Sequence, residues 1–325
     1  MTFDGLFTHA MIHELNQTLQ NGRVTKISQP YPNEVILTIR ANRTNYPVLL
    51  SANPRYARFQ ITQIPYTNPA VPTNFTMMLR KYLEGAKLLK IKQLDNDRVV
   101  YFEFLTRNEL GDKLPLLLSA EIMGRYSNVI LINQSTNKII DTIKHVGMDQ
   151  NRYRTLLPGA TYRQPPTQNK ENPFEQDSNT FEELIQKYPN REVLADNLLK
   201  QYQGISRDNA LALADKLHSS NNFVQAFNDF LAMTEDPIPT MNGNNFSIFT
   251  DNPNDKKFTT LSEMLDVFYH TKANRDRVQQ QGGQLLHVIR KNLQRNKKKL
   301  KKLSNELKAT ENADEYRIKG EVLTT

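Results

Sequence analysis

Hydrophobic and polar positions follow two different periods in the first part of the chain. Residues 8–20 repeat apolar positions every three to four residues, which predicts an amphipathic helix. The next segments are short, rich in β-branched residues and separated by Pro and Asn turns, which is typical of antiparallel strands. These predicted strands are residues 24–28, 34–40, 48–52 and 58–61.

The same order then repeats. Residues 75–86 are predicted to form a second helix that ends near Gly85. Five further strands follow, at residues 88–94, 99–104, 114–122, 129–132 and 138–146. The N-terminal region is therefore predicted to be α+β, with antiparallel meander sheets that are each preceded by a helix.

One turn of the second meander carries more polar chemistry than a hairpin needs. A tight turn requires only Gly, Asn or Asp. Here Glu121, Met123, Arg125 and Asn128 surround Gly124. This surplus suggests a surface that binds a partner.

Strand order predicts which turns lie together. Successive hairpin turns alternate between the two ends of an antiparallel sheet. The turns at residues 95–98 and 123–127 are separated by a single intervening turn, so they should share an end. The charged residues predicted to lie on this common rim are Asp97, Arg98, Glu121 and Arg125. Ordinary solvated turn residues are the alternative interpretation.

The middle of the chain changes composition. Residues 164–180 are rich in Pro, Asn and Gln, which predicts a linker, and residues 181–230 return to a helical pattern. Two short helices joined at residues 204–206, Gly-Ile-Ser, resemble a helix-hairpin-helix. Backbone N–H groups at such a helix start suit phosphate, but the turn serves packing equally well.

The last part of the chain is predicted to be a long helix. A hairpin is expected at residues 241–249, and Leu261 opens the helix. Its apolar positions have the spacing of a heptad seam. Asn296 takes the one core position of this seam, between Leu293 and Leu300, that has no apolar residue. The seam residues are Leu286, Ile289, Leu293, Leu300, Leu303 and Leu307. No partner helix follows, so we expect the chain to be part of a longer protein.

Positive charge is concentrated in this helix. The chain has a net charge of +8, and residues 272–308 hold 12 Lys and Arg against Asp276 and Glu306. Such a stripe is typical of proteins that bind a polyanion, because each neutralised phosphate releases counterions. A solvated coiled-coil face is the alternative. The residues predicted to contact nucleic acid are Arg290, Lys291, Arg295, Lys297, Lys298, Lys299, Lys301 and Lys302.

Composition limits the remaining classes. The 325 residues are enough for two or three domains, and they include no Cys, which excludes disulfides and thiol nucleophiles. No segment has the roughly 18 consecutive apolar residues of a membrane span, and Asp4 stands where a signal peptide needs basic residues. A cytoplasmic location is therefore expected.

Catalytic and metal motifs are sparse in the sequence. His9 and His13 stand four residues apart beside Glu14, but the metalloprotease order and a third ligand are lacking. No phosphate-binding loop, dinucleotide fingerprint or nucleophile elbow occurs. We expect no metal, no cofactor and no classical nucleotide-hydrolysing or acyl-transfer site.

Several short motifs, in a fixed order along the whole chain, resemble the NFACT family. They are Phe3-Asp-Gly-Leu-Phe7 with His-Glu-Leu at 13–15, Asp97-Arg98, Glu121-Ile-Met-Gly124 with Ser127-Asn128, Leu156 with Pro158-Gly159, and Leu261-Ser-Glu-Met-Leu265 leading to Asn274-Arg-Asp-Arg277. Each motif is weak alone, and together they are specific.

The resemblance implies a fold and a division into domains. It implies an NFACT-N domain at residues 1–178, similar to the N-terminal domain of formamidopyrimidine-DNA glycosylases, and a helix-hairpin-helix domain at 179–235. A hairpin and return segment at 236–268 would pack on the NFACT-N domain, and residues 269–325 would start a basic coiled coil. Those glycosylases begin with Pro and Glu, whereas this chain begins Met1-Thr2, so glycosylase activity is not expected.

The resemblance also implies a function. The family's factors bind large ribosomal subunits that carry an obstructed peptidyl-tRNA, receive alanyl-tRNA and support template-free addition of an alanine tail. The tRNA-binding residues that match are Asp97, Arg98, Glu121, Ile122 and Met123, to which the rim adds Arg125. Peptide transfer would be left to the ribosome. A fibronectin-binding surface adhesin, as an old label of the family suggests, and an architectural coiled-coil scaffold are the alternatives.

Overall fold

The structure, a computed structural model, describes residues 3–176, 178–243, 245–249 and 252–324. The chain forms two compact units, Met1–His270 and Thr271–Thr325. The division into four domains remains a prediction.

A large antiparallel sheet forms the centre of the first unit. Its nine strands are β1 (Arg23–Tyr31), β2 (Glu34–Ala41), β3 (Thr44–Ser51), β4 (Arg58–Ile61), β5 (Lys87–Gln93), β6 (Val99–Arg107), β7 (Lys113–Glu121), β8 (Asn128–Asn133) and β9 (Lys138–Thr142). Their order is β4-β3-β2-β1-β5-β6-β7-β8-β9. The α+β class and the strand-by-strand meander are confirmed.

The prediction of separate meander sheets is wrong. Arg23 of β1 pairs with Lys87 of β5 and joins the two meanders into one sheet. The backbone N–H of Leu88 donates to the carbonyl of Gly22 at 2.8 Å, and the N–H of Gly85 donates to the carbonyl of Val24 at 2.8 Å. Hydrophobic patterning marks strands but not which strands pair across a helix, so this junction was not predictable.

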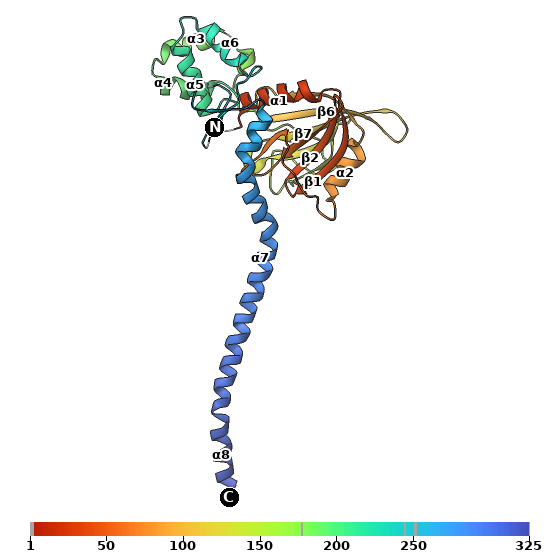
Figure 1. Cartoon of the computed structure of the whole chain (residues 1–325), viewed down its shortest axis with the longest axis vertical. Helices are drawn as coiled ribbons and strands as arrows, with labels where there is room; N and C mark the ends of the chain where they lie inside the picture. The colour runs from red at the N-terminus through yellow and green to blue at the C-terminus, as the bar shows by residue number, and fades with distance from the viewer. Residues whose placement is uncertain (1–2, 177, 244, 250–251, 325) are drawn as a thin grey trace. The chain divides into compact units, whose positions relative to one another are not determined.

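Two helices cover the sheet. Helix α1 (Gly5–Leu19) packs against β5 and β2, and helix α2 (Asn74–Leu83) packs against β1 and β9 (Figure 1). Each begins at a side-chain cap, because Asp4 accepts a hydrogen bond from the N–H of Phe7 and Thr73 accepts one from the N–H of Thr76. Both predicted helices are confirmed.

Both edges of the sheet are covered. At the β4 edge, the N–H of Ile61 donates to Oγ of Ser262 at 3.1 Å, and the N–H of Gln63 donates to Oδ2 of Asp266 at 2.8 Å. At the β9 edge, the N–H of Ile139 donates to the carbonyl of Ala160 at 2.9 Å. An outward-facing strand N–H group therefore has a partner at each edge, that of Ile61 in β4 and that of Ile139 in β9.

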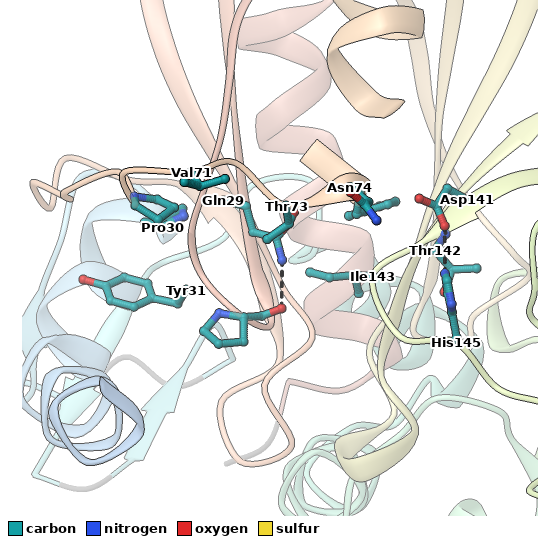
Figure 2. A pocket seen from close by; sticks show the side chains of 13 residues that line it. Gln29, Pro30, Tyr31, Val71, Thr73, Asn74, Asp141, Thr142, Ile143 and His145 are labelled. Carbon is teal, nitrogen blue, oxygen red and sulfur yellow. Dashed lines mark hydrogen bonds and ion pairs between the residues drawn. The ribbon is translucent and has the colours of Figure 1, made fainter. Parts of the chain in front are cut away.

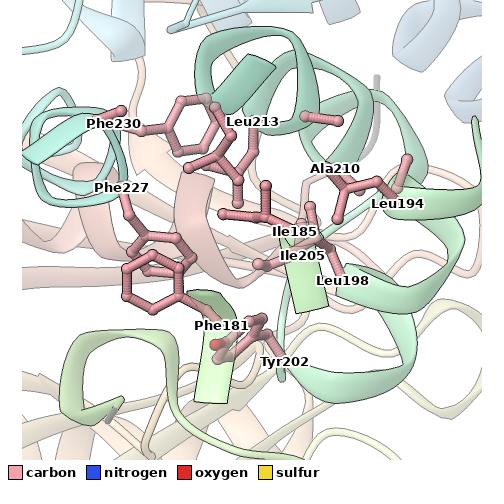
Figure 3. Packing of buried hydrophobic residues seen from close by; sticks show 14 of the residues in the cluster. Phe181, Ile185, Leu194, Leu198, Tyr202, Ile205, Ala210, Leu213, Phe227 and Phe230 are labelled. Atoms are coloured by element: carbon pink, nitrogen blue, oxygen red, sulfur yellow. The ribbon is translucent and has the colours of Figure 1, made fainter. Parts of the chain in front are cut away.

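Residues 178–232 form four helices with their own core. They are α3 (Ser178–Lys187), α4 (Arg191–Gln201), α5 (Arg207–His218) and α6 (Phe223–Ala232). Phe181 stacks on Phe227 with ring centroids 4.9 Å apart, and side chains of all four helices converge around this pair (Figure 3). Leu6 at the start of α1 belongs to the same cluster.

The predicted linker at residues 164–180 is partly structured. It contains a short 3-10 helix, η2 (Pro173–Glu175), and α3 already begins at Ser178. The N–H of Glu171 donates to the carbonyl of Gln201 at 2.9 Å, and the N–H of Gln203 donates to the carbonyl of Glu171 at 2.8 Å. These backbone bonds tie the segment to the end of α4, which composition alone did not indicate.

The chain ends in two helices. The hairpin predicted before them is present as β10 (Thr240–Asn242) and β11 (Asn245–Ser247), with β12 (Lys256–Lys257) beside β10. Helix α7 (Leu261–Glu311) and helix α8 (Ala313–Thr324) follow. The predicted seam residues from Leu286 to Leu307 are all exposed, and their pairing in a coiled coil remains a prediction. No helix in the described ranges is long and apolar enough to cross a membrane.

Candidate functional site

The two polar turns lie on one rim of the sheet, as predicted. In the pairing of β6 with β7, Val99 stands opposite Glu121. The N–H of Ile122 donates to the carbonyl of Arg98 at 2.8 Å. The turn that carries Asp97 and Arg98 is therefore the immediate neighbour of the turn that starts at Ile122. We call this end of the sheet, residues 94–98 and 121–128, the rim.

The first turn of the rim presents Arg98. Oδ1 of Asp97 accepts the N–H of Arg98 at 2.7 Å, and Nε2 of Gln93 donates to the carbonyl of Asp97 at 2.8 Å. Both charged side chains are half-buried. Within the described part of the chain, the guanidinium of Arg98 forms no ion pair. A fixed turn thus holds a cation available for a ligand.

A buried ion pair joins the start of the second turn to Arg154. Glu121 is fully buried, and its carboxylate accepts two hydrogen bonds from the Arg154 guanidinium, of which Nη1 to Oε1 is 2.8 Å. The hydroxyl of Tyr162 donates to the same Oε1 at 3.0 Å. Burial raises the pKa of Tyr162, and the charge of Glu121 adds to the shift. Burial opposes the charge of Arg154, but Glu121 outweighs it and the pKa of Arg154 is raised.

The structure divides the predicted tRNA strip into buried and accessible residues. Glu121 is 0% exposed and Ile122 is 4% exposed, so both side chains shape the rim from its interior. Met123 is half-buried, and Arg125 is exposed. The role of each of these residues in tRNA binding remains a prediction.

The exposed tip of the second turn is a short 3-10 helix, η1 (Gly124–Tyr126). Gly124 has φ of +56°, which favours glycine. The Arg125 guanidinium lies over the Tyr126 ring at 4.6 Å from its centroid. The N–H of Met123 donates to Oγ of Ser127 at 2.8 Å and closes the turn.

Sequence reasoning missed the loop at residues 144–163, which is attached to this rim. Nδ2 of Asn128 donates to the carbonyl of Lys144 at 2.8 Å, and Arg154 and Tyr162 contact Glu121. The signal was the interleaving of Arg with Tyr at residues 152–154 and 162–163. That pattern is typical of RNA-binding surfaces.

The turn between α4 and α5 already holds a carboxyl group of the chain. The carboxylate of Asp4 already occupies the start of α5, where Oδ2 accepts the N–H of Ser206 at 2.8 Å and Nδ2 of Asn209 at 2.6 Å. Its Oδ1 accepts the N–H of Phe7 at 2.9 Å. Burial raises the pKa of Asp4. The structure therefore favours the packing role of this turn, because an internal carboxyl already bonds the N–H at the start of α5.

This junction also fixes the first turn of the rim. Nδ2 of Asn96 donates to the carbonyl of Gln203 at 2.7 Å. A Cβ atom on Gly5 would lie 1.9 Å from the carbonyl oxygen of Asn96, and one on Gly204 would lie 1.8 Å from it. Three backbone segments therefore approach so closely that only glycine fits, immediately before Asp97.

A pocket of about 450 Å³ lies between residues 29–32, 69–75 and 141–145 (Figure 2). Several of its polar side chains bond within its own walls. Nε2 of Gln29 donates to the carbonyl of Pro32 at 2.9 Å, and Oδ1 of Asp141 lies 2.9 Å from Nε2 of His145. The pocket offers mainly Pro, Val, Ile and Phe surface, and the rim carries the charged chemistry.

The histidines of α1 have structural partners. The His9 ring stacks on Phe174 with centroids 4.2 Å apart, and burial lowers the pKa of His9. Nε2 of His13 lies 2.8 Å from Nε2 of Gln17. In the residues that the structure describes, no cluster of three acidic or histidine side chains could hold a metal.

The eight basic residues of α7 that were predicted to contact nucleic acid are exposed. They are Arg290, Lys291, Arg295, Lys297, Lys298, Lys299, Lys301 and Lys302. Nζ of Lys302 lies 3.7 Å from a carboxylate oxygen of Glu306, which is a weak surface pair. The stripe predicted from sequence is therefore accessible to a polyanion.

Comparison with known proteins identifies the family. A family profile described as NFACT N-terminal and middle domains matches residues 4–325. The chain belongs to the NFACT family. Among NFACT relatives, the Rqc2 homolog RqcH of Streptococcus pneumoniae is 44% identical over 326 residues, which cover 100% of this chain and 58% of the relative. RqcH of Bacillus subtilis is 39% identical over 335 residues and also covers 100% and 58%.

A solved structure supports the NFACT-N fold. The N-terminal part of the fibronectin/fibrinogen-binding protein from Streptococcus suis has a TM-score of 0.77 and 39% identity, covering 83% of this chain and 100% of that chain. The chain spans 58% of the length of the RqcH relatives it matches. Activities of whole RqcH proteins are therefore proposals for this chain.

Proposed function

We propose that the chain is the RNA-binding N-terminal part of a cytoplasmic ribosome quality-control factor. It would bind obstructed large ribosomal subunits that carry peptidyl-tRNA, receive alanyl-tRNA and support template-free alanine tailing of the stalled chain. The RqcH names of relatives that match the whole chain support this role. The observation that carries it is the hydrogen bond that joins Arg98 to Ile122, because it unites two candidate tRNA turns.

In this proposal the rim positions tRNA and performs no side-chain chemistry. Arg98 and Arg125 supply planar, permanently charged donors for phosphates or base edges. Asp97 fixes the turn by accepting the N–H of Arg98. RNA is generally recognised at unstacked bases of loops, so an anticodon loop is a suitable target. Peptide transfer is left to the ribosome.

The other parts receive supporting roles. The basic stripe of α7 would contact ribosomal RNA, because its Lys and Arg side chains are exposed along one helix. Its exposed leucine seam would pair with a second helix as a coiled coil. Helices α4 and α5 would be the helix-hairpin-helix unit, used for packing through Asp4.

The test is the double variant Asp97→Ala with Arg98→Ala. We expect tRNA to stop co-purifying with it, while its circular dichroism matches the wild type. Asp112→Ala with Lys113→Ala is the matched control, because it removes an adjacent acid and base from the turn at the opposite end of the sheet. Unchanged co-purification of tRNA with the Asp97→Ala, Arg98→Ala variant would contradict the assignment of the rim as the tRNA-binding site.

Fibronectin binding is the second candidate, favoured by the likeness to the fibronectin/fibrinogen-binding protein of Streptococcus suis. It makes a different prediction for the same proteins. Immobilised fibronectin should then retain the chain, and ribosomal RNA should not accompany it. Sedimentation with large subunits at low salt, without retention on fibronectin, would contradict the adhesin.

A further inference from the structure

We propose that Tyr153 and Arg163 form a second contact for unpaired RNA bases beside the rim, and that Glu121 positions this contact through Arg154 and Tyr162. The inference rests on the proposed function, because it adds residues that bind the same tRNA. It gives Glu121 a role that agrees with its burial.

Exposed Phe and Tyr side chains are confined to this part of the first unit. Among the Phe and Tyr residues described between 3 and 270, only Tyr126 and Tyr153 are exposed, at 63% and 44%. Each carries a guanidinium over its ring. Arg125 lies 4.6 Å from the Tyr126 centroid, and Arg163 lies 4.9 Å from the Tyr153 centroid. Two similar stacked Arg–Tyr pairs therefore face solvent. We call them the first plate, Arg125 with Tyr126, and the second plate, Arg163 with Tyr153.

Buried contacts connect the second plate to the rim. Nη1 of Arg154 donates to Oε1 of Glu121 at 2.8 Å and to the carbonyl of Arg163 at 3.0 Å. Tyr153 precedes Arg154, and Arg163 follows Tyr162, which also bonds Glu121 at 3.0 Å. Both surface residues are thus chain neighbours of side chains that Glu121 holds.

Local hydrogen bonds fix the orientation of the second plate. Oδ1 of Asn151 accepts the N–H of Tyr153 at 2.9 Å. Nη1 of Arg163 donates to the carbonyl of Tyr153 at 2.9 Å, which keeps the guanidinium over the ring. The plate is therefore preorganised, which lowers the entropic cost of stacking a base on it.

The chemistry of the plates fits RNA. Bases of single-stranded RNA stack on aromatic rings and on Arg planes, and phosphates bind the cations beside them. Arg125, Arg152 and Arg163 are exposed at these two turns, against the exposed acid Asp149. An excess of cations around flat rings favours an unstacked, negatively charged strand over an acidic or apolar protein partner.

The first experiment measures binding of labelled tRNA to Tyr153→Ala with Arg163→Ala. Stacking on one aromatic is worth roughly a 10-fold change in affinity, so we expect binding about 10-fold weaker with an unchanged urea midpoint. Tyr82→Ala is the control. Tyr82 also lies beside a cation, Lys81, but next to residues 106–110 at the opposite end of the sheet.

The second experiment detects stacking directly. The chain has no Trp, so Tyr153→Trp and Tyr82→Trp are single reporters. We expect saturable quenching of Tyr153→Trp by tRNA and none of Tyr82→Trp. The inference would be overturned, and the proposed function kept, if the wild type binds tRNA, the double variant binds it with the same affinity, and tRNA does not quench Tyr153→Trp. Failure of the wild-type chain to bind tRNA would overturn the proposed function, and the inference with it.

A third comparison tests the positioning role of Glu121. In the Tyr153→Trp protein, Glu121→Gln should reduce quenching under conditions in which the chain is folded. Leu116→Ala is the control, because it removes a fully buried side chain from the same strand without touching Arg154. Equal quenching in both proteins would show that Glu121 contributes only stability.

Discussion

The ion pair of Glu121 with Arg154 is almost completely shielded from water. The side chain of Glu121 is 0% exposed and that of Arg154 is 5% exposed. Each charge is therefore stabilised by its partner and not by water. Removing one partner of such a pair leaves an uncompensated buried charge. The pair therefore links the stability of the fold to the shape of the rim.

We predict that Glu121→Gln lowers the free energy of unfolding by about 3 to 5 kcal/mol. Urea unfolding followed by circular dichroism measures this. Glu103→Gln is the control, because the Lys92–Glu103 pair is 49% and 19% exposed and surface pairs contribute at most about 1 kcal/mol. Similar losses in the two variants would contradict the assignment of a buried charge.

A second carboxyl makes stability depend on pH. Glu14 accepts the N–H of Ser262 at 3.2 Å at the start of α7, and burial raises the pKa of Glu14 from 4.5 to about 7. Between these values the folded chain binds more protons than the unfolded chain. Its free energy of unfolding therefore falls as the pH rises from 4.5 to about 7.

We predict that Glu14→Gln removes up to about 3 kcal/mol of this pH dependence. Urea midpoints of the wild type and the variant should converge at about pH 4.5 and diverge by about pH 7, with the variant more stable at the higher pH. Parallel pH profiles would show that Glu14 keeps its ordinary pKa in the folded chain.

At this scale the sequence predicted which residues share the rim but not which of them are buried. Alternating hairpins place Asp97, Arg98, Glu121 and Arg125 at one end by geometry alone. The burial of Glu121 depends on Arg154, which is 33 residues away along the chain. No local pattern encodes that partner.

At the scale of elements, the predicted helices and strands of the first 150 residues were close to the observed bounds because period and turn residues are local signals. Pairing between elements was harder. The β1–β5 junction and the contact of Glu171 with the end of α4 depend on where the backbone returns in space. The double use of Asp4 at the starts of α1 and α5 was also unpredictable, because Ser206 is 202 residues away.

The junction of α1, the first rim turn and the α4–α5 turn gives a prediction for glycine. Gly204→Ala should cost about 3 kcal/mol or more, because it adds a clash with Asn96 to the strain of its positive φ. Gly111→Ala is the control. Gly111 has φ of +88° and no atom within 4 Å of an added Cβ, so it should show the strain alone, about 1 to 2 kcal/mol.

Thermal unfolding and tRNA affinity should both be measured for these glycine variants. Because Asn96 precedes Asp97, Gly204→Ala should also weaken tRNA binding at temperatures where it stays folded. Equal stability of Gly204→Ala and Gly111→Ala would contradict the close backbone approach.

At the scale of the whole molecule, charge is divided between the two units. The stripe on α7 predicts a salt-dependent interaction with ribosomal RNA. Changing Lys297, Lys298, Lys299, Lys301 and Lys302 to Gln should lower the magnitude of the slope of log affinity against log salt by up to about 4. Sedimentation with large subunits across a salt series measures it.

The control for this experiment carries the same number of neutralised lysines in the first unit. Suitable exposed positions are Lys26, Lys81, Lys90, Lys113 and Lys187. Their substitution should leave the slope for large subunits nearly unchanged. An equal decrease in both proteins would attribute binding to net charge and would contradict α7 as the RNA contact.

The covered β4 edge affects the solubility of this protein at high concentration. An open strand edge is a template on which another chain can add a strand, and a nine-stranded sheet would otherwise offer it to every neighbouring molecule. Ser262 and Asp266 satisfy the N–H groups of Ile61 and Gln63. The start of α7 thereby protects the sheet from aggregation. A chain that ends before Leu261 would expose unpaired backbone groups of β4 to other chains, even if its sheet folded correctly.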